Sequence, residues 1–146
     1  MNLLGVLDIS GSALTAERQR AEVVASNLAN AQTTRTAKGG PYRRQLVVFR
    51  TRQTGKGGFA GVLSKFNDPY AEGVEVTRVV PDPTPPVQRY EPAHPDADSQ
   101  GYVSYPSINP IEEMVNLMGA ARSYEANVAA VQATKNMLSA SLEILS

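Results

Sequence analysis

The 146-residue sequence contains no cysteine and only one histidine, His94. Without cysteine there is no disulfide, no thiolate nucleophile and no cysteine-ligated metal site, and the redox compartment stays open. No glycine-rich phosphate loop follows a predicted strand. No serine, histidine and aspartate come with a nucleophile elbow or a run of oxyanion glycines. These absences predict a protein that is not an enzyme and that holds no cofactor.

The N-terminus also lacks the features of a cleaved secretory signal. No basic residue precedes its apolar residues, and Asp8 interrupts them after a few positions. If the protein leaves the cytoplasm, we expect it to be exported without a cleavable signal peptide. Hydrophobic residues make up 42% of the chain, which permits a core in one domain's length of sequence and predicts no direct membrane insertion.

Charge is unevenly divided along the chain, although the formal net charge is zero. Residues 1–56 hold nine Lys and Arg against three Asp and Glu, and residues 57–146 hold five against eleven. Basic residues can mark nucleic-acid binding, but few aromatic residues accompany them here to stack on bases. We therefore predict no nucleic-acid partner. Complementarity between neighbouring subunits is compatible with the same asymmetry.

The last part of the chain, residues 109–146, predicts one helix of about ten turns. Asn109 can cap its start, and Pro110 suits the first helical position. Glu112 can reach back as in a capping box. Apolar and semi-apolar residues recur at the heptad spacing of a coiled coil, with Lys135 as the exception. These seam positions are Met114, Leu117, Ala121, Tyr124, Val128, Val131, Leu138, Leu142 and Leu145.

The opposite face of this helix is small and uncharged. Beyond Met114 the helix has only four charged residues, too few for a helix that exposes a whole side to water. Something must cover that side, either the rest of a monomeric bundle or copies and partners packed around the helix. The small face comprises Gly119, Ser123, Ala126, Ala130, Ala133, Met137 and Ala140.

Residues 1–34 predict a second terminal helix with a weaker heptad pattern. Gly5 and Gly11 each lower helix propensity by about 1 kcal/mol relative to alanine. We therefore expect frayed first turns and a firm helix from near Gly11 or Ser12. The positions seven apart are Leu7, Leu14, Ala21 and Leu28, and their companions are Leu3, Ser10, Glu17, Val24 and Ala31.

Asparagines recur on both predicted helices. A polar side chain near an apolar seam can fix the register of two helices by bonding between them. We interpret these asparagines as such interhelical groups rather than as site residues. They are Asn27, Asn30, Asn116, Asn127 and Asn136.

Residues 35–108 predict a loop followed by a small β-rich domain. The helix period ends at residues 32–40, where a glycine pair predicts a mobile loop. Four prolines between positions 81 and 86 favour a turn over a polyproline ligand, because the run is short and strand patterns flank it. Strands are predicted at residues 41–50, 59–66, 74–80, 87–90 and 102–105.

These segments together predict an α+β fold. Long N- and C-terminal helices, residues 1–34 and 109–146, form a coiled-coil-like helical pair. The small β-rich domain of residues 35–108 is inserted between them.

One stretch, residues 91–98, clusters polar side chains. His94, Asp96 and Asp98 are residue types that can ligate a cation. Two prolines stiffen the stretch, however, and it has no glycine at a calcium-loop spacing. His94 also has no second histidine or cysteine to complete a zinc set. We expect a rigid hydrogen-bonded loop that holds no metal, with a metal-dependent enzyme built on this stretch as an alternative.

Several motifs resemble those of the bacterial flagellar rod and hook proteins. Ser-Asn-Leu-Ala-Asn-Ala at 26–31, a threonine at 33 or 34, and Pro-Tyr-Arg-Arg at 41–44 are similar to the N-terminal signature of that family. Residues 90–98, 101–103, 113–114 and 121–127 look like the proximal-rod members. The resemblance covers nearly the whole chain. Residues 106–109 depart from the usual pattern at the turn into the last helix.

The resemblance implies a structural subunit of the proximal rod in the flagellar basal body, crossing the periplasm. Such a subunit would polymerise through its terminal helices and help transmit torque from motor to hook. Its partners would be other rod subunits, copies of itself and the flagellar type III export apparatus. A soluble coiled-coil adaptor or regulatory protein is the alternative.

The terminal helices supply the expected assembly interface. Its residues are Leu7, Leu14, Ala21, Leu28, Asn27, Asn30, Met114, Leu117, Ala121, Tyr124, Asn127, Val128, Val131, Leu138, Gly119, Ala126 and Ala133.

Overall fold

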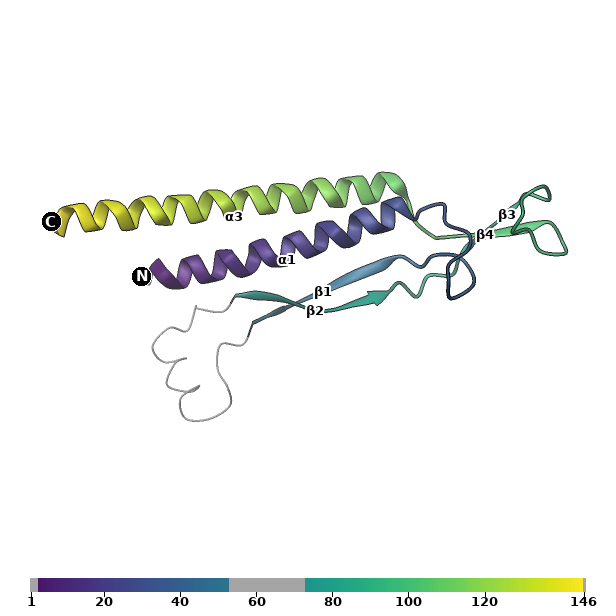
Figure 1. Cartoon of the computed structure of the whole chain (residues 1–146), viewed down its shortest axis with the longest axis horizontal. Helices are drawn as coiled ribbons and strands as arrows, with labels where there is room; N and C mark the ends of the chain where they lie inside the picture. The colour runs from purple at the N-terminus through teal and green to yellow at the C-terminus, as the bar shows by residue number, and fades with distance from the viewer. Residues whose placement is uncertain (1–2, 53–72, 146) are drawn as a thin grey trace, which may run out of the picture. The chain divides into compact units, whose positions relative to one another are not determined.

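The computed structural model describes residues 3–52 and 73–145, with side chains as far as residue 143. Two long helices stand at the ends of the described chain, with short strands between them in sequence (Figure 1). This arrangement confirms the predicted α+β class. The elements are α1 (Leu3–Ala29), β1 (Gln45–Thr51), β2 (Val74–Pro81), β3 (Val87–Tyr90), β4 (Tyr102–Tyr105) and α3 (Pro110–Leu145).

The strands form two antiparallel pairs, β1 with β2 and β3 with β4. In the second pair Val87 lies opposite Tyr105, and Tyr90 lies opposite Tyr102. Four of the five predicted strands are confirmed. The fifth, at residues 59–66, lies outside the described residues.

The proline-rich connection between β2 and β3 begins with a side-chain turn at Asp82. The Asp82 carboxylate accepts the backbone N–H of Thr84 at 2.9 Å and its hydroxyl at 2.6 Å. A side chain that bonds two residues ahead reproduces the geometry of a backbone turn. The run of prolines is therefore part of a folded connection.

The start of α3 follows the predicted capping chemistry. The N–H of Ile111 donates to the side-chain oxygen of Asn109 at 3.0 Å, and the N–H of Glu113 donates to the Asn109 carbonyl at 3.1 Å. The first bond satisfies one of the four backbone donors that a helix start leaves without a partner. Asn109 is thus confirmed as the N-cap, while the return bond from Glu112 stays a prediction.

α1 begins earlier than the sequence suggests. It is helical from Leu3 and continues through Gly5 and Gly11, so the expectation of a firm helix only from near Gly11 or Ser12 was wrong. The reason is tertiary packing, because Ser10 is buried at 6% exposure within these first turns. Burial of one face offsets the weak helix propensity of two glycines.

The segment between α1 and β1 is a loop, as predicted. Its tight turn is closed by the N–H of Thr36, which donates to the Gly40 carbonyl at 2.9 Å. Gly39 and Gly40 have φ angles of 82° and 72°, in the left-handed region that glycine adopts without steric cost. The glycine pair is therefore required by the turn, and the mobility of this loop stays a prediction.

Residue contacts divide the chain into two compact units. Of the described residues, unit 1 comprises 3–19, 49–52, 73–77 and 120–145, and unit 2 comprises 20–48 and 78–119. Each helix contributes to both units. The predicted domain boundaries after residues 34 and 108 stay a prediction.

In unit 1, a serine hydroxyl fastens α1 to the start of β2. Ser12 Oγ accepts the N–H of Val74 at 3.0 Å and donates to the carbonyl of Ile9 at 2.7 Å. Gly73 is buried beside this hydroxyl, and a Cβ placed there would overlap it. Arg52 adds an ion pair with Asp8 of α1. The contact therefore depends on a close backbone approach that glycine permits.

This contact predicts that Gly73→Ala destabilises the chain by about 1 to 3 kcal/mol, the usual range for overpacking. The added methyl group must displace Ser12 and break its bond to Val74. Gly11→Ala is the matched control, since a Cβ there meets nothing within 4 Å. It should stabilise α1 by about 1 kcal/mol. Urea unfolding of both variants measures the two effects, and equal midpoints would contradict the prediction.

Candidate assembly surface and its polar anchor

Unit 2 contains a buried polar cluster centred on Asn27 of α1 and Glu113 of α3. Each of these residues is only 1% exposed. The side-chain nitrogen of Asn27 donates to Glu113 Oε2 at 3.0 Å and to the Gln45 carbonyl at 2.9 Å. Its side-chain oxygen accepts the N–H of Gln45 at 2.8 Å and the hydroxyl of Tyr42 at 3.2 Å. One amide therefore ties α1 to β1 and to α3.

Arg44 completes the cluster by neutralising Glu113. Its Nε and Nη2 donate to Glu113 Oε1 at 2.9 and 2.5 Å. Its Nη1 lies 3.7 Å from the Asp82 carboxylate, and the Arg44 carbonyl accepts the N–H of Asp82 at 2.8 Å. A buried carboxylate persists only when it is paired and hydrogen-bonded. The sequence alone could not identify this pairing, because residues 44 and 113 are far apart in the chain.

The environment of Asp82 favours its ionised form. The hydroxyl of Thr84 donates to the carboxylate and lowers the pKa of Asp82 below its ordinary value, with the Thr84 N–H and the Arg44 charge acting in the same direction. The turn after β2 is thereby coupled electrostatically to the Arg44 and Glu113 pair.

The predicted seam positions of α1 face inward in the described chain. Leu7, Leu14, Ala21 and Leu28 are all half-buried. Among their companions, Ser10 and Val24 are buried. Ala16 and Asn27 are buried as well and lie outside the predicted pattern, so the heptads identified only part of the face that packs within the chain.

On α3 the buried positions lie one residue away from part of the predicted seam. Glu113, Ala120 and Thr134 are 1–2% exposed and fall on a seven-residue repeat. The predicted positions Met114 and Ala121 are exposed instead. Two of the three buried side chains are polar, so an apolar pattern could not find them. In the other predicted row, Leu117, Val131 and Leu138 are half-buried, but Tyr124 is exposed.

Three of the five predicted asparagines make side-chain bonds of two kinds, and for Asn116 and Asn136 the interhelical interpretation stays a prediction. Asn27 bonds across to α3, which confirms the interhelical interpretation for that residue. Asn30 instead donates to the Ser26 carbonyl at 2.9 Å, and Asn127 donates to the Ser123 carbonyl at 2.8 Å. These two bonds stay within their own segments. The interhelical interpretation of Asn30 and Asn127 stays a prediction for the assembled protein.

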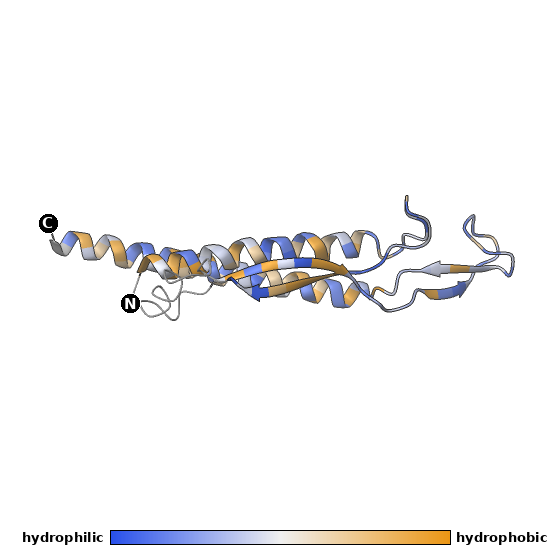
Figure 2. Ribbon diagram, turned by 90° about the horizontal axis from the view of Figure 1, so that it is seen from below, coloured by the Kyte–Doolittle hydropathy of each residue, from blue (hydrophilic) through white to orange (hydrophobic). Residues whose placement is uncertain are grey.

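α3 leaves large apolar side chains and small side chains in contact with solvent. Hydrophobic residues occur around the helix rather than on one stripe (Figure 2). Among the small residues, Ala126 and Ala133 are exposed. This exposed apolar surface is the candidate assembly surface of the helix. The exposed large side chains of α3 are Ile111, Met114, Val115, Met118, Tyr124, Met137 and Leu142.

The side chains of residues 91–98 brace the loop between β3 and β4. His94 Nδ1 accepts the N–H of Asp96 at 3.1 Å. Asp98 accepts the N–H groups of Gln100 at 2.8 Å and Tyr102 at 2.9 Å. These bonds confirm the expected hydrogen-bonded loop.

Asp96 fastens this loop to the segment after α1. Its carboxylate accepts the hydroxyl of Thr34 at 2.8 Å and lies 3.6 Å from the guanidinium of Arg35. Among the residues that the structure describes, no three His, Asp or Glu side chains are grouped to hold a metal ion. That the loop binds no metal remains a prediction.

Comparison with known proteins connects this architecture to a family. Residues 7–35 match the family model for the flagella basal body rod protein, and residues 99–144 match the model for the flagellar basal body rod FlgEFG protein C-terminal region. The FlgC basal-body rod protein of Borreliella burgdorferi is 38% identical and aligns over 99% of both chains. The chain belongs to the family of the flagellar basal-body rod protein FlgC.

Other relatives in this family align over similar lengths. The Bacillus subtilis protein is 41% identical over 94% of this chain and 95% of its own. The protein of Escherichia coli O157:H7 is 43% identical over 94% of both chains. The two family models cover most of α1 and α3, including both central residues of the polar cluster, Asn27 and Glu113.

Neither described helix combines the length and the apolar character that crossing a lipid bilayer requires.

The cluster predicts that Glu113→Ala destabilises the fold by about 3 kcal/mol, since truncating one partner of a buried pair leaves the other charge poorly satisfied. Glu112→Ala is the matched control, because Glu112 is an exposed carboxylate on the same helical turn. It should change the free energy of unfolding by less than about 0.5 kcal/mol. Chemical denaturation of both variants provides the measurement. Similar losses in the two variants would show that the cluster does not hold the fold.

The lowered pKa of Asp82 predicts a pH-dependent contribution to stability. The ionised carboxylate stabilises the fold above its unfolded-state pKa of about 4, and this contribution disappears as the pH falls through the lowered folded-state value. Asp82→Asn should therefore reduce the free energy of unfolding at pH 7, and its difference from the native chain should shrink with acidification. Denaturation curves at stepped pH values test this expectation, and a difference independent of pH would refute it.

Proposed function

We propose that the chain is a structural, non-enzymatic subunit of the bacterial flagellar basal-body rod that polymerises through its terminal helices. The observation that carries the proposal is the surface of α3, which leaves apolar side chains up to 72% exposed in a chain of this family. Apolar surface exposed on a lone subunit contributes no hydrophobic stabilisation, whereas packing between helices would remove that surface from water. The relatives are named as rod proteins, which does not favour a soluble adaptor.

The polar cluster suggests how such a subunit would carry load. Asn27, Arg44 and Glu113 join α1, β1 and α3 through directional bonds rather than through apolar contact alone. A network in which every member is satisfied favours a single arrangement. A subunit held in this way suits the proposed transmission of torque from motor to hook.

The remaining parts of the proposal concern location and partners. We place the subunit in the proximal rod, where it would contact other rod subunits and copies of itself. We further propose export by the flagellar type III apparatus without a cleavable signal peptide. The proposed interface is the set of helix residues given above, and its exposed part lies on α3.

The proposal is tested in cells that lack the gene and carry a plasmid copy. Purified basal bodies should contain the chain, and cells without it should build no complete rod. A soluble adaptor would instead form a discrete oligomer absent from basal bodies. Hydrogen exchange on the dilute isolated chain gives a second test, because full protection of residues 112–146 would mean that the helix buries its faces without assembly.

The exposed small face predicts that Ala126→Leu and Ala133→Leu impair assembly without impairing the fold. Added bulk in a packed interface costs about 1 to 3 kcal/mol per site, and a polymer bears that cost in every copy. In the isolated chain the change should be nearly neutral, since leucine is almost as good a helix former as alanine. Motility is compared with circular dichroism of the purified variants. Normal swimming with both substitutions would show that this face meets no neighbour.

A further inference from the structure

The first turns of α3 carry a ridge of four exposed apolar side chains. We define the ridge as Ile111, Met114, Val115 and Met118, whose exposed fractions are 72, 50, 57 and 54%. Their spacing of three, four and seven residues places them on one face of the helix. The ridge is therefore continuous surface rather than four isolated side chains.

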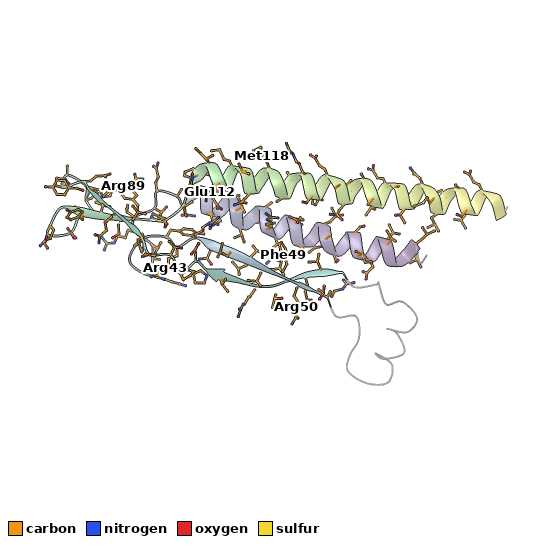
Figure 3. All side chains as sticks on the ribbon, turned by 180° about the vertical axis from the view of Figure 1, so that it is seen from behind. Arg43, Phe49, Arg50, Arg89, Glu112 and Met118 are labelled. Carbon is orange, nitrogen blue, oxygen red and sulfur yellow. The ribbon has the colours of Figure 1, made fainter. Side chains whose placement is uncertain are left out.

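The ridge lies on the side of α3 opposite the residues that the chain buries. At 3.6 residues per turn, Ile111 and Val115 each point about 160° away from the direction of Glu113. Glu113 is 1% exposed and marks the inward face of α3 in unit 2. Figure 3 shows Met118 on the side of α3 that faces away from α1. Packing within unit 2 cannot cover the ridge.

The size of the ridge argues against a stable dimer in solution. Four side chains that are about half exposed offer on the order of a few hundred Å², whereas a stable interface buries about 800 Å² per partner. A contact of this size holds only when other contacts of an assembly support it. The ridge therefore fits a repeated contact inside a polymer.

The same helix carries a complementary row fifteen residues later. We define the alanine row as Ala126, Ala129, Ala130 and Ala133, which repeat the ridge spacing of three, four and seven residues. Three of these alanines are exposed and Ala130 is half-buried. Facing positions pack well when large side chains oppose small ones. Each large side chain of the ridge thus corresponds in spacing to one alanine.

Resting on the proposed function, we propose that the ridge packs against the alanine row of a second copy of this chain. The two α3 helices run parallel with an offset of fifteen residues, or roughly 22 Å along the axis. Ile111 of one copy then opposes Ala126 of the next, and Met118 opposes Ala133. Because ridge and row are different surfaces, the contact is head-to-tail and leaves a free ridge and a free row at the ends of an assembly.

Charge selects the parallel direction. The spacing pattern is the same when reversed, so an antiparallel pairing would also place the ridge on the alanine row. That arrangement would centre on Arg122, so that Arg122 of one copy would lie opposite Arg122 of the other. Like charges placed together at an interface are strongly unfavourable. In the parallel arrangement, Arg122 comes opposite Met137 of a neighbouring copy rather than opposite another Arg122.

The cysteine-free sequence permits a direct test by disulfide cross-linking in purified basal bodies. With Ile111→Cys and Ala126→Cys in one chain, mild oxidation should yield multimers of this chain. Ile111→Cys with Ala133→Cys is the matched control and reports the antiparallel arrangement. Multimers from the control pair, a product containing a different polypeptide, or no product from the first pair would overturn the proposal.

A volume exchange provides a test that needs no oxidation. Met118→Ala and Ala133→Met should each reduce swimming, and the double variant should restore it because the large and small partners have changed places. No effect of the single variants, or no rescue in the double variant, would overturn the proposal. Presence of the native chain in basal bodies reports separately on the rod function, so failure of the helix contact is distinguishable from failure of that function.

Discussion

The buried carboxylate of Glu113 is the constraint on which unit 2 depends. A charge that is 1% exposed requires partners, and the fold supplies them from Arg44 before β1 and from Asn27 on α1. Asn27 in turn holds the backbone of Gln45 at the start of β1. The end of α1, the start of β1 and the start of α3 are therefore held together by the need to pair one buried charge. Removing any partner leaves polar groups buried without compensation.

Local signals predicted the elements of the fold well. Asn109 and Pro110 marked the start of the last helix, and glycine and proline separated the strands. The terminal heptads indicated two long helices in a family whose relatives are rod proteins. These features depend on neighbouring residues, so a linear pattern contains them. Membership in the family adds what such patterns cannot supply, namely the class of structure in which the related proteins occur.

Long-range contacts were beyond the sequence patterns for a physical reason. The seam of α3 was displaced because the inward positions include Glu113 and Thr134, which hydropathy assigns to the surface. The early start of α1 was missed because propensity does not include the packing of residues such as Ser10. The closeness of Gly73 to Ser12 involves residues far apart in the chain. In each case tertiary burial outweighed the local preference.

The polar cluster also has a mechanical consequence. An apolar heptad seam packs almost as well after one helix slides by seven residues, a step of roughly 10 Å. Such slippage is the easy mode of failure when two helices are sheared along their length. After one step, Glu113 would face neither Arg44 nor Asn27, and its charge would stay buried without a partner. The cluster therefore resists sliding of one helix along the other, which apolar contacts of equal area do not.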